Sequence, residues 1–158
     1  MIPRSSWRQA VLIAAIVCGL AYDGLGQSPE FSEPWKKPNV ALAIDPYEGN
    51  EIDWDKLATD RRVVAIIHRS TIGDRADRKY GERRDEAKKR GYKWGAYHFG
   101  KLGDPIKQAD FFLDTVKPTA DDLMALDLES TDWWKHMSLG EARVFIKRAS
   151  RKRPAAIL

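Results

Sequence analysis

Cysteine is almost missing from this chain of 158 residues, in which Cys18 is the only one. It lies in an apolar segment near the N-terminus, and Val17 precedes it where the lipid anchor of a bacterial lipoprotein requires a small residue. If the segment is removed, the remaining chain has no disulfide and no thiolate nucleophile. Its stability must then come from packing alone.

Long hydrophobic runs are also missing. The main apolar segment, "AVLIAAIVCGLA" (10–21), is shorter than the about 20 residues that cross a bilayer. Arg4 and Arg8 precede it, and small residues up to Gly26 follow. This order is typical of a secretory signal peptide. We therefore expect residues 1–26 to be a signal peptide, an exported protein (periplasmic or extracellular), and no stable membrane span after removal of this leader.

A strong excess of one charge sign is also missing: the net charge is +4, and charges of both signs are interspersed along most of the chain. The segment "DRADRKYGERRDEAKKRG" (74–91) mixes both signs, which is typical of a solvated helix face. Because no basic block is interleaved with aromatic residues in a binding motif, we expect no nucleic-acid partner. A mildly positive chain does favour approach to an anionic polymer such as a cell wall.

Residues 27–39 contain several prolines, and we expect them to form an extended linker. Four short apolar runs follow this stretch at intervals along the chain. Continuous apolar runs are typical of strands buried on both faces of a parallel sheet. They are "VALAID" (40–45), "VVAIIH" (63–68), "KWGAYHF" (93–99) and "LMALDLE" (123–129). The sequence thus predicts one α/β domain over residues 40–158.

Helix signals fill the intervals between these runs. Asp53 is placed to cap a helix from Trp54, and Gly91 to end the helix around residues 80–90. Asp104 with Pro105 and the capping box "SLGE" (138–141) open two more. In the last helix we expect an apolar stripe, formed by Leu139, Ala142, Ile146 and Ala149. Four to five βα units do not close an eight-stranded barrel of about 250 residues, so we expect an incomplete barrel.

Carboxylates follow two of the predicted strands. Asp45 ends the first run, while Asp127 and Glu129 end the fourth. Residues two apart on a strand face the same side, about 6.6 Å apart along it, which brings two carboxyls within the range that glycosidases use. Two nearby anions resist ionising together, so one holds a proton near neutral pH. We expect Glu129 to be that acid and Asp127 and Asp45 to stay ionised and stabilise positive charge.

The order and spacing of these motifs resemble the family 25 glycoside hydrolases, which are lysozymes that cleave peptidoglycan. The resemblance runs from Ala41 to about Ser150. "AIDPYEGNEIDWDKL" (43–57) resembles the opening strand with its active-site Asp, the Gly-Ala-Tyr-His-Phe strand stands at 95–99, and "ALDLE" (125–129) resembles the Asp-x-Glu strand. Its members continue through further strands that carry another active-site Asp, so the resemblance implies a TIM-like barrel that is truncated at the C-terminus.

The resemblance also implies an activity and a set of site residues. The activity is hydrolysis of the β-1,4 bond between N-acetylmuramic acid and N-acetylglucosamine with retained configuration. Glu129 corresponds to the general acid, Asp127 and Asp45 to its paired carboxylates, and Tyr97 to an aromatic residue near the sugar. His98 and Trp133 are further candidate substrate contacts. The implied partner is peptidoglycan, and no cofactor or metal is implied.

Simpler interpretations remain open at this point. His98 and His68 each fit a structural role in the core, and Trp133 fits a place at a core edge. A catalytically inactive remnant or a cell-wall-binding module is the alternative to a muramidase. A metal site built from the two histidines and Asp127, serving deacetylation of glycans, is a third possibility, although no tight ligand spacing supports it.

Overall fold

The structure is a computed structural model, and the residues that it describes are 33–129 and 135–151. They divide into two compact units after Lys37. The described part of the first unit holds a short 3-10 helix, η2 (Pro34–Lys36), within the stretch that we expected to be an extended linker. The predicted signal peptide (1–26) lies outside the described residues.

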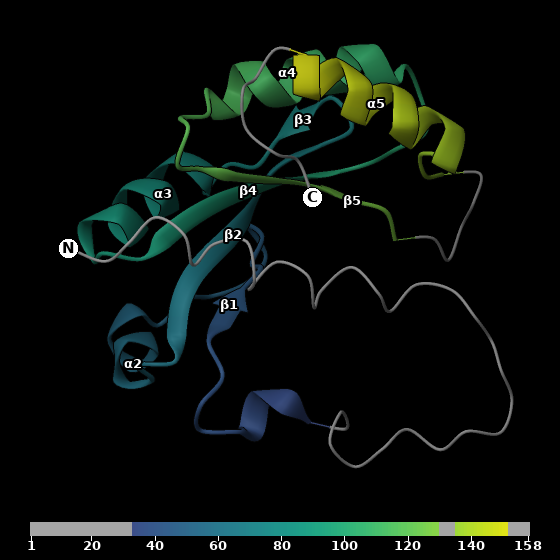
Figure 1. Ribbon diagram of the computed structural model, residues 1–158. Helices are drawn as coiled ribbons and strands as arrows, with labels where there is room; N and C mark the ends of the chain where they lie inside the picture. Colours follow the sequence, from purple (N-terminus) through teal and green to yellow (C-terminus); the bar gives the residue numbers. More distant parts are fainter. Residues whose placement is uncertain (1–32, 130–134, 152–158) are drawn as a thin grey trace, which may run out of the picture. The chain divides into compact units, whose positions relative to one another are not determined.

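The second unit is built on a mainly parallel sheet (Figure 1). Four strands lie side by side in chain order: β1 (Leu42–Ile44), β2 (Val63–Ile72), β4 (Lys93–Phe99) and β5 (Leu123–Asp127). Each neighbouring pair is parallel, and a short strand, β3 (Arg75–Ala76), folds back antiparallel onto β2. The predicted α/β class, with its parallel sheet, is confirmed.

The strands are connected by helices that begin and end where the local signals place them. They are α2 (Trp54–Thr59), α3 (Tyr80–Lys89), α4 (Pro105–Val116) and α5 (Leu139–Arg151). Asp53 and Asp104 accept hydrogen bonds from the first-turn amides of α2 and α4. Ser138 and Glu141 exchange bonds in the predicted capping box of α5. Gly91, with φ of 83°, follows α3 in the left-handed conformation that glycine adopts readily.

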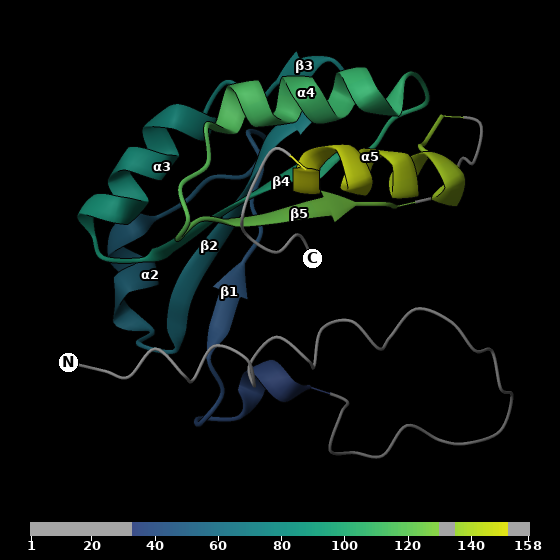
Figure 2. The same ribbon diagram turned by 45° about the horizontal axis from the view of Figure 1, so that its top comes forward.

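The core forms between one face of the sheet and the helices that cover it, as Figure 2 shows for α3, α4 and α5. Ile66, Trp94, Ala96 and Met124 from the strands are buried against Phe112 and Phe145 from the helices. These strand residues stand level with one another across the sheet, because Ile66 pairs with Trp94 and Ala96 with Met124. Burial of this face fixes which side chains point to the other one.

The segment after the second apolar run differs from the prediction. The strand continues through Ile72, turns at Gly73 (φ 56°) and returns as β3. Asp77 then accepts hydrogen bonds from the amides of Glu48 and Lys79, so α3 starts only at Tyr80. The mixed charge of residues 74–79 belongs to a hairpin and a turn rather than to a helix.

The expected apolar stripe of α5 is partly wrong. Ala142 and Ala149 are buried as expected, but Leu139 is 73% exposed and Ile146 is 37% exposed. Phe145 takes the central place, stacked on His98 at a centroid distance of 4.8 Å and fully buried. The contacting face is therefore rotated by about one residue from the one predicted.

The barrel is not closed in the described residues, in which β1 pairs only with β2 and β5 only with β4 among the named strands. This agrees with the expected incomplete barrel. No helix in the part of the chain that the structure describes has the length and apolar character needed to span a membrane.

Phe145→Ala tests the packing of α5. Because this ring is fully buried between His98 and Phe112, we expect the free energy of unfolding to fall by about 3–5 kcal/mol. Urea unfolding followed by circular dichroism measures it. The matched control Leu139→Ala removes an exposed side chain and should change stability by less than about 0.5 kcal/mol. Equal losses in the two variants would contradict the observed face.

Candidate active site

The carboxyl ends of the parallel strands bring the predicted carboxylates to one edge of the sheet. Asp45 directly follows β1, Asp127 is the last residue of β5, and Glu129 comes two residues later. Asp127 stands level with Phe99 of β4, and Tyr97 of β4 stands level with Arg69 of β2. Since paired residues of parallel strands point to the same side, Arg69 and Tyr97 share a face.

These side chains lie on the face of the sheet away from the helices, which we call the open face and define by Asp45, Arg69, Tyr97 and Asp127. Along β4 and β5 the alternate residues are buried towards the helices, whereas Tyr97 and Asp127 keep partial exposure. Asp45 and Glu129 are exposed. The site thus lies where solvent and a ligand have access.

The pKa of Asp127 is raised well above its ordinary value. Burial raises its pKa to about 6, and the negative charges of Glu129 and Asp45 add to the effect. The three carboxylates are therefore close enough to influence one another. The raised pKa falls on Asp127, for which the sequence led us to expect the ionised form.

Tyr97 is held as a neutral phenol beside the carboxylates. Burial raises its pKa to about 12, with the nearby charges of Asp127, Asp45 and Asp77 adding to the rise and Arg69 opposing it. A phenol that stays protonated at all physiological pH values donates a hydrogen bond but carries no charge. Its location next to the carboxylate cluster agrees with the predicted substrate contact without testing it.

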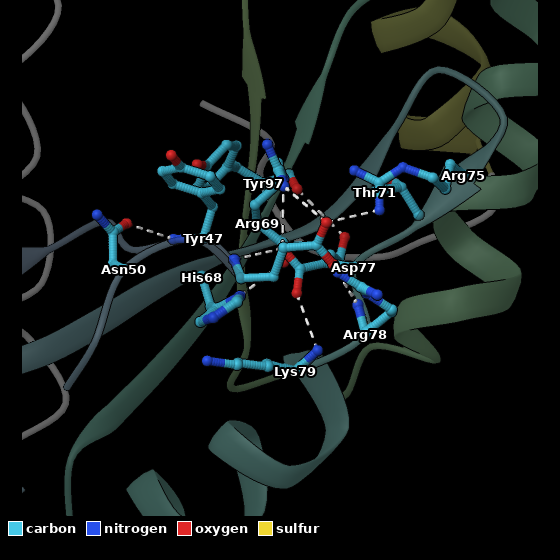
Figure 3. Close-up of polar contacts among 12 residues, drawn as sticks. Tyr47, Asn50, His68, Arg69, Thr71, Arg75, Asp77, Arg78, Lys79 and Tyr97 are labelled. Carbon is cyan, nitrogen blue, oxygen red and sulfur yellow. Dashed lines mark hydrogen bonds and ion pairs between the residues drawn. The ribbon is translucent and has the colours of Figure 1, made fainter.

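Arg69 is a member of the site that sequence reasoning missed. Its Nε donates to Asp77 Oδ2 at 3.3 Å, and its guanidinium lies 4.5 Å from the centroid of the Tyr47 ring. Its backbone amide donates to the carbonyl of Pro46 at 2.9 Å, directly after Asp45. Figure 3 shows Tyr47, Arg69 and Asp77 together, close to Tyr97. An arginine inside a strand of otherwise apolar and small residues was the available signal.

Glu48 connects the loop after β1 to the β2–β3 hairpin. Its carboxylate accepts hydrogen bonds from Arg75 Nη1 at 2.7 Å and from the backbone amide of Arg78 at 3.0 Å. The bond from the Arg78 amide and that from the Arg75 side chain lower the pKa of Glu48 to about 2. The amide of Glu48 in turn donates to Asp77. This network fixes the loop that begins at Asp45.

The two histidines do not belong to the open face. His98 is fully buried on the helix side, where Nε2 donates to Gln108 Oε1 at 3.0 Å and Nδ1 contacts the Thr71 hydroxyl at 2.7 Å. Burial lowers its pKa to about 4. His68 is equally buried and accepts a bond from Arg83. We therefore correct the prediction that His98 contacts substrate, because the alternation of the strand turns it into the core.

Two other expectations concern Trp133 and a metal site. Trp133 lies outside the described residues, so its predicted sugar contact remains a prediction. Within residues 33–129 and 135–151, no group of three or more histidine, cysteine, aspartate or glutamate side chains converges as a set of metal ligands.

The sequence of this chain matches a known family. The family described as "Glycosyl hydrolases family 25" matches residues 44–156, which include Asp45, Asp127 and Glu129. This match covers more than half of the chain. The chain belongs to glycosyl hydrolase family 25.

Solved structures of family 25 enzymes and related proteins have the same fold. A bacterial lysozyme from Streptomyces coelicolor has 21% identity and a TM-score of 0.61, over 75% of this chain and 62% of that one. A family 25 lysozyme from Aspergillus fumigatus has 19% identity and a TM-score of 0.61, over 73% and 63%. The modular autolysin LytC from Streptococcus pneumoniae, solved with a synthetic peptidoglycan ligand, has 14% identity and a TM-score of 0.59, over 73% and 31%.

The family 25 chain spans only about 62% of the length of the Streptomyces lysozyme. No curated protein sequence matches it. The structural likeness therefore shows the fold, while family membership comes from the sequence match.

The raised pKa of Asp127 predicts a pH-dependent cost in stability. A carboxyl whose pKa is higher in the folded state stabilises the fold below its unfolded pKa, and this stability is lost as the pH rises through about 6. Asp127→Asn should therefore raise the free energy of unfolding at pH 7 by about 1–2 kcal/mol, allowing for solvent screening.

Near pH 3.5 the effect should shrink, because Asp127 is then protonated in both states. Thermal unfolding at both pH values measures the difference. Asp121→Asn, at an exposed aspartate of the turn before β5, is the matched control and should leave stability unchanged. A destabilised Asp127→Asn protein at pH 7 would show that the carboxylate is better accommodated than its surroundings indicate.

Proposed function

We propose that this family 25 protein is an exported muramidase that hydrolyses the β-1,4 bond between N-acetylmuramic acid and N-acetylglucosamine in peptidoglycan. The observation that carries the proposal is the convergence of Asp45, Asp127 and Glu129 at the carboxyl edge of the sheet, where the pKa of Asp127 is raised to about 6. The bound peptidoglycan ligand of the LytC relative supports the substrate class. The sequence pattern of residues 1–26 supports export.

Each residue has a defined part in the proposed reaction. Glu129 delivers its proton to the glycosidic oxygen as the bond from that oxygen to the anomeric carbon breaks. Asp127 and Asp45, in their ionised forms, stabilise the positive charge that develops on the sugar ring. An ionised Asp or the acetamido group of the substrate attacks the anomeric carbon as this bond breaks. Glu129, now ionised, then takes a proton from the water that displaces the attacking group, which completes hydrolysis with retained configuration. Tyr97 donates a hydrogen bond to the substrate, and Trp133 is proposed to stack on a sugar.

The raised pKa of Asp127 bears on this scheme. Burial and the charges of Glu129 and Asp45 raise it to about 6, so Asp127 is ionised, and able to stabilise positive charge, above that pH.

Glu129→Gln tests the assignment of the general acid. An amide of the same shape has no acidic proton, so we expect release of reducing ends from purified peptidoglycan to fall by at least about 100-fold. The control Glu141→Gln changes the capping glutamate of α5, which hydrogen-bonds Ser138 away from the open face. It should retain activity at temperatures where the fold is intact.

The outcome separates the muramidase from its alternative. Muramic acid reducing ends released by the wild type and lost in Glu129→Gln establish the reaction. Saturable binding to peptidoglycan without any release would replace the proposal with a cell-wall-binding module.

A further inference from the structure

A cavity beyond the carboxylates lies at the ends of β2 and β4 and the start of α4. It encloses about 710 Å³ between the β2–β3 turn (Ile72 to Arg75), the loop after β4 (Lys101 to Asp104) and the first turns of α4, which contribute Lys107, Gln108 and Phe111. A cavity of this size accommodates a ligand of several amino-acid residues. We call it the turn pocket.

The turn pocket presents two ammonium groups that have no carboxylate partner among the described residues. Arg75, which also lines the pocket, is paired with Glu48. Lys101 and Lys107 form no such pair within residues 33–129 and 135–151. The Lys101 ammonium instead lies 5.6 Å from the centroid of the Phe99 ring.

The rest of the lining is mixed in character. Ile72 and Phe111 provide apolar walls, and Leu102 is 62% exposed at the mouth. Asp74 adds a negative charge on an exposed turn. Two ammonium groups without a carboxylate partner among the described residues, the exposed carboxylates of Asp74 and Asp104, and apolar surface together match a short peptide that carries carboxylates, small apolar side chains and an amine.

The wall that carries Lys101 is held in place from inside the protein. Gln108 is buried, its Nε2 donates to the Lys101 carbonyl at 2.9 Å, and its Oε1 accepts from the Lys101 amide at 3.1 Å. The same Oε1 accepts from His98. The pocket is therefore formed before any ligand arrives, which lowers the entropic cost of binding.

The turn pocket and the carboxylate site lie at the same edge of the sheet. Ile72 at the end of β2 stands level with Phe99 of β4, and Phe99 stands level with Asp127 of β5. The amide of Gly73 donates to the Phe99 carbonyl, and the amide of Gly100 to the Asp127 carbonyl. A group attached to a glycan at Asp127 would reach the pocket by extending along these strand ends, across β4 to the end of β2.

We propose that the turn pocket binds the peptide stem attached to the muramic acid residue of peptidoglycan, an inference that rests on the proposed muramidase function. The stem leaves the glycan on the sugar whose glycosidic bond is cleaved. Lys101 and Lys107 bind its carboxylates, Asp74 binds its amine, and Ile72 and Leu102 contact its alanine methyl groups. The protein thereby prefers glycan that still carries stems.

The direct test is a binding titration that needs no catalysis. The ¹⁵N-labelled full chain is titrated with soluble N-acetylmuramoyl tetrapeptide and, separately, with N-acetylmuramic acid, which has no stem. We expect the tetrapeptide alone to shift the amide resonances of Gly73, Leu102 and Gly103. The variant Lys101→Gln with Lys107→Gln should weaken this binding about fivefold, as expected for two exposed charge pairs.

The matched control is Lys56→Gln with Lys89→Gln, which removes the same charge from exposed positions on α2 and α3 and should leave binding unchanged. Equal shifts with the stem-free sugar, no shift at the pocket amides, or undiminished binding by the Lys101/Lys107 variant would each overturn the proposal. A peptide that binds with equal loss in both variants would indicate attraction by net charge, which also overturns it.

A second readout separates this inference from the proposed function. On stem-bearing peptidoglycan the Lys101/Lys107 variant should raise KM about fivefold with kcat preserved, whereas on glycan stripped of stems by an amidase it should equal the wild type. Absence of hydrolysis by any form rejects the muramidase, yet the titration still decides whether the pocket binds the stem.

Discussion

Parallel pairing of β1, β2, β4 and β5 is the constraint on which the rest of the structure depends. It places all four carboxyl ends at one edge, and burial of Ile66, Trp94 and Met124 against the helices decides which side chains face away from them. A shift of one residue in any strand would exchange the two faces. Asp127 would then point into the core and His98 into solvent. The chemistry of the edge is thus specified by hydrophobic packing on the opposite face.

The loop that carries Asp45 depends on charges rather than on apolar packing. Arg69 and Asp77 are both buried, and each is paired. Arg83, also buried, donates to the carbonyls of Tyr47 and Asn50. Because a buried charge without its partner is costly, the removal of one member destabilises the others. These contacts hold the loop against β2 and α3 even though Asp45 itself is exposed.

Much of this arrangement follows from local sequence signals, and the remainder does not. Caps at Asp53, Asp104 and Ser138 act within one helical turn, so sequence alone places them. The β2–β3 hairpin was missed because its charges resemble a solvated helix, and its partner Glu48 lies about 30 residues earlier in the chain. Which face of α5 contacts the sheet depends on the space available beside His98. Because β4 and α5 together determine this space, the sequence of α5 alone does not predict the face.

In the candidate site, too, some features follow from the sequence and others depend on the three-dimensional structure. Strand ends and the spacing of two residues between Asp127 and Glu129 predicted that carboxylates gather at one edge. Which of them holds the proton depends on burial and on neighbouring charge in three dimensions, and the structure raises the pKa of Asp127. The burial of His98 followed from the alternation of β4, but only once the helix side was known.

The edge positions of β1 and β5 in the described sheet have a consequence for the timing of motions. β2 and β4 are hydrogen-bonded to strands on both sides, whereas β1 and β5 have one such neighbour each. Backbone amides in singly bonded strands open to solvent more often than those between two strands. Deuterium should therefore enter β1 and β5 before β2 and β4. Arg69 and Tyr97 lie on the strands that exchange slowly, whereas Asp45 and Asp127 lie at the ends of strands that open more often. The two carboxylates should therefore move more than Arg69 and Tyr97.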